Sequence, residues 1–451
     1  MSSLISTLNR FRLIATGGPE PPKVEASQLI RFGILGAANI AYLSPHPSYL
    51  PTYLPTYLPT YLPTYLTNPP PSPQALITPA RQHPEVVVQA VAARDVKKAE
   101  AYAKKHKIPE VFASYQELVD SPTVDAVYIP LPNGLHLEWA VKAVRAGKHV
   151  LLEKPAVANA EEAEVLFREV GLRGEGEGGK QVVVLEAFHY RFQPSWRLFL
   201  SLLEPGNVAH VETNLVIPNL FPPDDIRFKY DLAGGALMDL TYGLSVVRGV
   251  YGTEPEECVA CEVKTMPPPY DERCDYAYDA QWRFPGGATA RTRATLRGGW
   301  GEMLRTMLPV AVTHRGVVVE EGNGTETVRT RKVTIINFMM GAIWHRIDVE
   351  DEFVVRRKEG EEEVKRWTVK ESRKAYTWKE ADIGVEKPSE PYWLTYKHQL
   401  DAFVDRVKGR EGTGAWVDGK DSIGQMRMID MAYTKSGLPL RETSKFRTGG
   451  S

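Results

Sequence analysis

A short run of small residues, GAANIA, has the composition of a turn that binds phosphate. Gly36, Ala38 and Ala41 occupy the small-residue positions of the dinucleotide fingerprint G-x-G-x-x-G/A. Such a turn lets the backbone approach a pyrophosphate, whose charge meets free N–H groups and the positive end of the next helix. Because the run follows an apolar strand and opens a helix, we expect these residues to bind a dinucleotide: Gly36, Ala38, Asn39 and Ile40.

The end of the second apolar run, EVVVQAVAARD, bears on which dinucleotide binds. An acidic residue there would accept the ribose hydroxyls of NAD, whereas small Ala93 followed by Arg94 suits the 2′-phosphate of NADP. We therefore expect NADP, with Arg94 as one of its ligands. The alternative is that Arg94 is an ordinary surface residue at the start of a helix.

Polar residues also follow the third and fourth apolar runs, in PLPNGLH and EKP. Ligands of open α/β sheets bind outside the carboxyl ends of the strands, so these residues lie where chemistry is expected. We assign these residues to the cofactor side of the cleft: Pro130, Asn133, His136, Glu153 and Lys154. On position alone, Lys154 could equally be a solvated lysine at a strand end.

The elements that must position these groups are visible as a repeating pattern from residue 30 onward. Continuous apolar runs alternate with the helical patterns VKKAEAYAKKHKIP and HLEWAVKAVRAGKH, which predicts a parallel sheet covered on both faces. After residue 205, segments such as HVETNLVIPN and TVRTRKVTIINF have the pattern of successive strands joined by turns that contain glycine. The expected fold is therefore α/β, with a second, strand-rich part.

Four motifs in this order resemble the Gfo/Idh/MocA oxidoreductases: the GAANIA turn, the block PNGLHLEWAVKAVRAGKHVLLEKP, VLEAFHYRFQP and GGALMDLTYG. The resemblance covers about residues 31 to 440 and is greatest to the branch of dimeric dihydrodiol dehydrogenase and NADP-dependent D-xylose 1-dehydrogenase. It implies an N-terminal Rossmann domain and a C-terminal α/β domain with a large, mainly antiparallel open sheet. We divide the chain into a disordered tail, two domains and a second tail: 1–29, 30–155, 156–441 and 442–451.

The resemblance also implies that three residues take part in catalysis: Lys154, Asp239 and Tyr242. Lys154 would bind substrate and act in catalysis, and a tyrosine on the helix after the Gly-Gly turn would be the general acid or base. Relatives place that tyrosine four residues after an aspartate, but here Tyr242 follows Asp239 by three. Because i+3 and i+4 share one face of a helix, we expect Tyr242 to reach the site. The alternative is that Tyr242 packs in the core.

The EAFHYRFQP block is expected to line the same cleft, because its polar and aromatic groups follow a strand and can orient hydroxyls. The candidate substrate-binding residues are Glu186, His189, Tyr190 and Arg191. Each of these residues could equally be a hydrogen-bonded residue between the two domains.

The resemblance implies transfer of hydride from a sugar or diol carbinol to NADP⁺, without a metal, in a homodimer formed through the C-terminal sheet. A second class stays open, since the galactose-pathway repressors of fungi resemble this fold and bind dinucleotide as sensors without turnover. The retained EKP motif with a downstream Asp and Tyr favours an enzyme.

The repeat YLPTYLPTYLPTYLPTYL interrupts the helix expected after the phosphate turn. A proline at every fourth position removes backbone donors and favours extended geometry, so we interpret 42–74 as a low-complexity insertion that leaves the fold as a loop. A neutral loop is favoured. The alternatives are a lesion that weakens cofactor binding and an interaction segment.

Composition excludes some classes of protein. The 451 residues carry a net charge of −1, and no apolar run approaches the ~18 residues of a membrane span, so neither nucleic acid nor membrane is expected as a partner. Three cysteines suit a reducing compartment, and we predict a cytoplasmic protein, although the first 18 residues faintly resemble a mitochondrial presequence. Cys258 and Cys261 lie in a predicted strand, where i and i+3 should face opposite sides, which favours free core cysteines.

Overall fold

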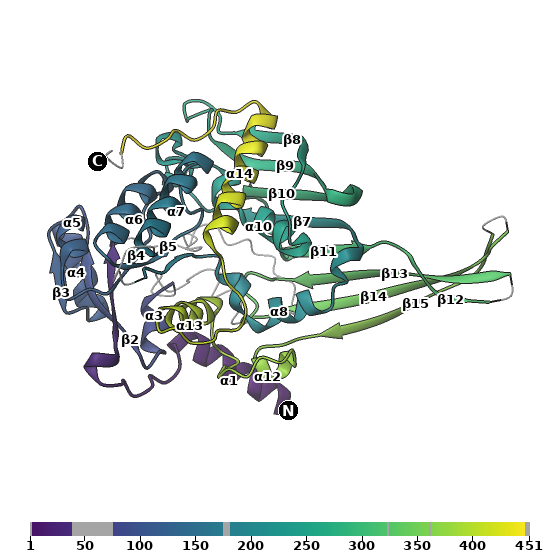
Figure 1. The fold of residues 1–451 in the computed structure, drawn as a ribbon, viewed down its shortest axis with the longest axis horizontal. Coiled ribbons are helices and arrows are strands. Elements are labelled where there is room, and N and C mark those ends of the chain that lie inside the picture. Colours follow the sequence, from purple (N-terminus) through teal and green to yellow (C-terminus); the bar gives the residue numbers. More distant parts are fainter. Residues whose placement is uncertain (1, 38–74, 175–180, 323, 360–361, 447–451) are drawn as a thin grey trace.

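The computed structural model describes residues 2–37, 75–174, 181–322, 324–359 and 362–446. Its first sheet has six parallel strands in the order β3-β2-β1-β4-β5-β6, which confirms the predicted parallel sheet (Figure 1). The strands are β1 Ile30–Leu35, β2 Val86–Ala92, β3 Glu110–Phe112, β4 Ala126–Ile129, β5 His149–Leu152 and β6 Val184–Glu186. Nearly every residue of β1, β4 and β5 is buried, as expected for strands covered on both faces.

Helices connect these strands: α3 Ile77–Arg81, α4 Val96–His106, α5 Tyr115–Asp120, α6 His136–Arg145 and α7 Ala160–Gly174. Asp95 and Ser114 cap α4 and α5 by accepting hydrogen bonds from backbone N–H groups in the first turn. Because β6 pairs with β5, the first sheet continues past residue 155, where the sequence placed a domain boundary.

The second sheet has nine strands in the order β15-β14-β13-β11-β7-β10-β9-β8, with β12 paired to β13. All neighbours are antiparallel except β7 and β10, which confirms a mainly antiparallel sheet. The strands are β7 Val208–Pro218, β8 Glu257–Thr265, β9 Asp275–Phe284, β10 Ala288–Gly298, β11 Pro309–His314, β12 Val317–Glu321, β13 Thr325–Ile336, β14 Arg346–Arg357 and β15 Glu363–Arg373. The outer ends of β13, β14 and β15 project from the body with β12, and we call this projection the arm (Figure 1).

The remaining helices are α8 Pro194–Ser201, α9 Ala236–Asp239, α10 Tyr242–Tyr251, α11 Trp300–Thr306, α12 Trp378–Ala381, α13 Thr395–Val407 and α14 Gly419–Ser436. Helix α10 packs on β7 and β10, and α14 packs on β8 and α7. Helix α13 returns to the first sheet, where Phe403 packs against Phe32 of β1 with ring centroids 5.5 Å apart.

The prediction of a disordered tail over 1–29 is wrong for the described residues. Helix α1, Ser2–Thr16, docks near α12 and α13 (Figure 1). The Arg10 guanidinium lies 3.8 Å from the centroid of the Tyr376 ring and donates to the Ile343 carbonyl, and Ile14 is buried. The partners of Arg10 lie more than 300 residues away, where no local pattern reveals them.

The predicted C-terminal tail is also anchored where it is described. The Ser444 backbone N–H donates to Glu162 at 2.6 Å, and Asn159 donates to the Thr443 hydroxyl at 3.1 Å.

The expectation that Cys258 and Cys261 face opposite sides of the sheet is wrong. Cys258 pairs with Trp282 and Cys261 with Ala280, and a bulge between Cys258 and Ala260 inserts one extra residue. The extra residue reverses the alternation, so both thiols lie on one face. Among the described residues, no group of three or more His, Cys, Asp or Glu side chains is arranged to hold a metal ion. No helix in the described ranges is long and apolar enough to cross a membrane.

Candidate functional site

Gly36 directly follows β1 and has the backbone geometry of a tight turn. Its φ is +109°, a conformation that side chains rarely adopt, and its N–H donates to the Ala92 carbonyl at 2.7 Å. A Cβ at this position would lie 3.3 Å from Cδ2 of Leu131. The described part of the turn therefore requires glycine, as a phosphate-binding turn does.

Of the other predicted cofactor-binding residues near this turn, only Arg94 lies within the described residues. Ala38, Asn39, Ile40 and the 42–74 insertion lie outside the described residues. Arg94 is exposed between the end of β2 at Ala92 and the cap of α4 at Asp95, at the same carboxyl edge of the sheet as Gly36.

Lys154 follows β5 at this same edge, and its ammonium group donates two hydrogen bonds to Asp239. Its Nζ donates to the Asp239 carbonyl at 2.7 Å and to Asp239 Oδ1 at 3.0 Å, with only 6% of the lysine side chain exposed. Arg227 Nε donates to the other carboxylate oxygen of Asp239 at 3.1 Å. Burial alone would raise the pKa of Asp239, but the charges of Lys154 and Arg227 outweigh burial and hold this pKa below its ordinary value.

Tyr242 lies beside Lys154 in spite of its shortened spacing, and it is fully buried. Helix α9 ends at Asp239 and α10 begins at Tyr242, so a break in the helix replaces the continuous turn. The Lys154 ammonium lies 5.0 Å from the centroid of the Tyr242 ring, and the Tyr242 hydroxyl lies 3.2 Å from Nε2 of His189. The structure thus brings Lys154, Asp239, Tyr242 and His189 together.

His189 links this cluster to a segment that the sequence did not indicate. Its Nδ1 lies 2.8 Å from the Thr395 hydroxyl, and its ring lies 4.2 Å from the ring of Tyr396. Burial, with a smaller effect of the Lys154 charge, lowers the pKa of His189 to about 3. The imidazole is therefore neutral at physiological pH, with one N–H to donate and one nitrogen to accept. Thr395 begins α13 and carries no local motif that could have identified it.

The other three predicted substrate residues have partners within the chain. Tyr190 shares a 2.9 Å hydrogen bond with Ser245, and Arg191 forms an ion pair with Asp421. Glu186 accepts from the Ala156 N–H at 2.9 Å and from the Ser422 hydroxyl at 2.5 Å. Burial raises the pKa of Glu186 to about 7. These contacts correspond to the alternative of hydrogen-bonded structural residues.

The residues at the ends of β4 and β5 hold the backbone around Lys154. His136 is fully buried between the carbonyls of Leu131, at 2.8 Å, and Pro155, at 3.0 Å, and burial lowers its pKa to about 4. Glu153 accepts from the Tyr128 hydroxyl at 2.6 Å, and burial raises the pKa of Glu153.

Two further candidates lie beside the cluster. Asn133 donates to the Ala233 carbonyl at 3.0 Å, which ties the loop after β4 to the segment before α9. Pro130 follows β4 directly and is partly buried.

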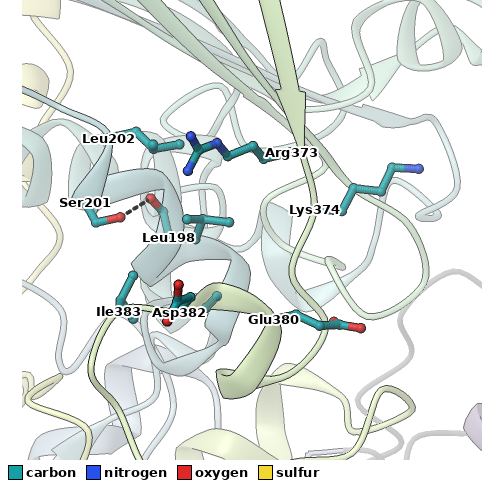
Figure 2. Close-up of a pocket in the computed structure, with 9 residues that line it drawn as sticks. Leu198, Ser201, Leu202, Arg373, Lys374, Glu380, Asp382 and Ile383 are labelled. Atoms are coloured by element: carbon teal, nitrogen blue, oxygen red, sulfur yellow. Dashed lines mark hydrogen bonds between the residues drawn. The ribbon is translucent and has the colours of Figure 1, made fainter.

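A pocket elsewhere in the molecule shares no residue with this cluster. Figure 2 shows it between α8, the end of β15 and α12, with a hydrogen bond from the Ser201 hydroxyl to the Leu198 carbonyl on its wall. It is lined by Leu198, Ser201, Leu202, Arg373, Lys374, Glu380, Ala381, Asp382 and Ile383.

Comparison with known proteins agrees with this architecture. Residues 73–174 match the model of the GFO_IDH_MocA oxidoreductase family, described by its NAD-binding Rossmann fold. The chain is 37% identical over 222 residues to a D-xylose 1-dehydrogenase (NADP(+)) of Haloferax volcanii, covering 49% of this chain and 65% of that protein. It is 34% identical over 268 residues to an uncharacterized oxidoreductase of Rhizobium meliloti, covering 58% of this chain and 67% of that protein.

A third relative is the trans-1,2-dihydrobenzene-1,2-diol dehydrogenase of Sus scrofa, 31% identical over 204 residues, covering 44% of this chain and 57% of that protein. Among solved structures, a 3-ketoreductase from Actinomadura kijaniata in complex with NADP and TDP-benzene superposes with a TM-score of 0.60. That match covers 90% of this chain and 98% of the other at 21% identity, and it establishes a shared fold. The chain therefore belongs to the Gfo/Idh/MocA oxidoreductase family, whose first domain has an NAD-binding Rossmann fold.

Proposed function

We propose that this protein is an NADP-dependent oxidoreductase that transfers hydride from a carbinol of a sugar or vicinal diol to NADP⁺. One observation carries the proposal: the buried Lys154 ammonium is held by Asp239 and lies 5.0 Å from the Tyr242 ring. Lys154 follows β5 and Gly36 follows β1 of one parallel sheet, so both lie at its carboxyl edge. The similarity to a D-xylose dehydrogenase and a dihydrodiol dehydrogenase supports a polyhydroxyl substrate.

Two described residues suit the cofactor. Gly36 leaves its turn free of a side chain, and exposed Arg94 supplies a cation beside that turn for a 2′-phosphate. NADP⁺ supplies the electrophilic ring that accepts the hydride.

The side chains of the cluster bind the reacting oxygen, take its proton and position one another. Lys154 donates a hydrogen bond to the reacting oxygen, and its positive charge stabilises the negative charge that develops there. The Tyr242 phenolate takes the hydroxyl proton as the C–H bond breaks, which leaves a carbonyl product. Asp239 and His189 position Lys154 and Tyr242 respectively, through the hydrogen bonds described above.

The test is to measure NADP⁺ binding by calorimetry and NADPH formation with D-xylose and with a trans-diol, for the wild type and for Lys154→Ala. We expect both proteins to bind NADP⁺ and the wild type alone to form NADPH, with at least about a 100-fold loss in the variant. Equal turnover in the variant would overturn the role of Lys154. Binding without turnover of either substrate by the wild type would favour a dinucleotide sensor.

A further inference from the structure

Arg441 and Asp275 form an ion pair that is withdrawn from solvent. Arg441 follows α14, Asp275 begins β9, and the exposed fraction of both side chains is 0%. The Arg441 guanidinium donates to Asp275 Oδ1 at 2.8 Å and lies 4.1 Å from the centroid of the Tyr433 ring. Removing two charges from water offsets much of what their attraction contributes, so a buried ion pair is by itself weak evidence for stability. The other contacts of the two residues indicate a second role.

Both members of the pair hold the turn that leads into α9. Arg441 Nε donates to the Gly234 carbonyl at 2.6 Å, and Asp275 Oδ2 accepts from the Leu237 backbone N–H at 2.8 Å. This N–H lies in the first turn of α9, where the helix itself offers no carbonyl to accept it. Asp275 thus supplies from β9 the cap that Gly235, the N-cap residue without a side chain, cannot supply.

Gly235 has no room for a side chain, because the ion pair lies against its backbone. Its φ is +137°, and a Cβ at this position would lie 2.3 Å from Asp275 Oδ1 and 2.4 Å from Nη2 of Arg441. The turn therefore approaches the two charges as closely as a backbone without a side chain allows.

The turn is continuous with Asp239, the residue that binds Lys154. The Asp239 N–H donates to the Gly235 carbonyl at 2.9 Å, so a shift of the turn would shift Asp239. Both the carbonyl and the carboxylate of Asp239 accept from the Lys154 ammonium. The buried ion pair thus fixes the backbone from which Asp239 presents both groups to Lys154.

We propose that Arg441 and Asp275 are positioning residues for the proposed reaction. They hold the turn before α9 in the arrangement from which Asp239 binds the Lys154 ammonium. Both act through this turn and not on the reacting atoms. The inference rests on the proposed function, because it assigns a role within that site.

The main test replaces the pair by apolar side chains in the double variant Arg441→Met/Asp275→Leu. This variant leaves no unpaired buried charge, so it should fold, and circular dichroism and the denaturation midpoint check this. It loses the contacts to the Gly234 carbonyl and the Leu237 N–H.

Two readouts compare the double variant with the wild type. The first is kcat and KM for NADPH formation, with whichever of D-xylose and the trans-diol the wild type oxidises. The second does not depend on turnover: it is the rate at which trinitrobenzenesulfonate modifies Lys154, measured by mass spectrometry of the peptide.

We expect kcat to fall about 10- to 100-fold in the double variant, because a misplacement of about 1 Å can cost as much as 100-fold. KM should change much less, since alignment is lost and not binding. Trinitrobenzenesulfonate should modify Lys154 faster, because Asp239 holds its ammonium less firmly. NADP⁺ affinity by calorimetry should be unchanged, since Gly36 and Arg94 belong to the first sheet.

Tyr433→Phe is the matched control. It removes a hydroxyl that donates to Asp275 Oδ1 at 3.0 Å and leaves both contacts to the turn in place. It should therefore keep the wild-type kcat and the wild-type rate of Lys154 modification. Arg441→Lys is a second variant: it keeps the positive charge but lacks the planar fork that spans Asp275 and the Gly234 carbonyl. It should change both readouts in the same direction as the double variant.

A folded double variant with the wild-type kcat and rate of Lys154 modification would overturn the inference. If the double variant does not fold, the same result in Arg441→Lys would overturn it. An equal loss in Tyr433→Phe would also overturn it, because the contacts to the turn would then not be the cause. A wild type that oxidises neither substrate would refute the proposed reaction, while faster modification of Lys154 in the variants would still support the positioning role.

Discussion

The carboxyl edge of the first sheet and the edge strand β15 of the second contain ion pairs of similar length in very different surroundings. Lys154 and Asp239 lie 3.0 Å apart with 6% and 25% of their side chains exposed, whereas Lys370 and Glu350 lie 2.6 Å apart with 67% and 39% exposed. Exposure decides the consequence, because water and salt screen the outer pair far more strongly than the inner one. The charges of the buried edge are therefore suited to chemistry, whereas the exposed pair on β15 contributes little to stability.

The largest effect is expected at the buried edge, where Tyr242 lies beside Lys154. Removing its hydroxyl in Tyr242→Phe should reduce the rate of NADPH formation about 100- to 10,000-fold, because the general base is lost while the ring stays. Calorimetry should give unchanged NADP⁺ affinity. Tyr190→Phe is the matched control, since the Tyr190 hydroxyl bonds only Ser245 among the hydrogen-bond partners described. A comparable loss in both variants would contradict a specific role of Tyr242.

The burial of Glu186 at this edge should make the free energy of unfolding depend on pH. Burial raises its pKa to about 7 in the folded state, from 4.5, so the native state holds its proton more tightly. The contribution of Glu186 is then fully favourable below pH 4.5 and is lost as the pH rises through 7. Between pH 5 and 8, the free energy of unfolding of the wild type should fall by about 2–3 kcal/mol relative to Glu186→Gln. Denaturant titrations of both proteins at pH 5 and pH 8 measure this difference. The same change in the free energy of unfolding for wild type and variant would refute the prediction.

Arg94 lies at the exposed rim of the same edge, where a smaller effect is expected. Arg94→Ala should weaken NADP⁺ binding by about 1.5–3 kcal/mol, the range for hydrogen bonds to charged groups, and leave NAD⁺ binding nearly unchanged. Calorimetry with both dinucleotides gives the ratio of their dissociation constants for the wild type and the variant. An equal effect on both cofactors would show that Arg94 does not contact the 2′-phosphate.

The exposed ion pair on β15 should give the smallest effect. Lys370→Ala removes a 2.6 Å ion pair from a largely exposed site, so the denaturation midpoint and the rate of NADPH formation should both stay within experimental error. A clear loss of stability would mean that this pair is shielded from solvent.

The sequence by itself determined the features that depend on local patterns. Apolar runs alternating with helical periodicity predicted the parallel sheet, and the position of EKP after a strand placed Lys154 at the correct edge. These features follow from backbone hydrogen bonding and burial, which act over a few residues and leave a period in the sequence.

Only the tertiary structure decided which groups meet. It brought Thr395 to His189 across 206 residues and Arg227 to Asp239, and it broke the helix between Asp239 and Tyr242 so that a spacing of three still reaches Lys154. It also docked α1 and placed two cysteines on one face through a bulge. Such contacts depend on how distant elements pack, and packing leaves no periodic mark on the residues involved.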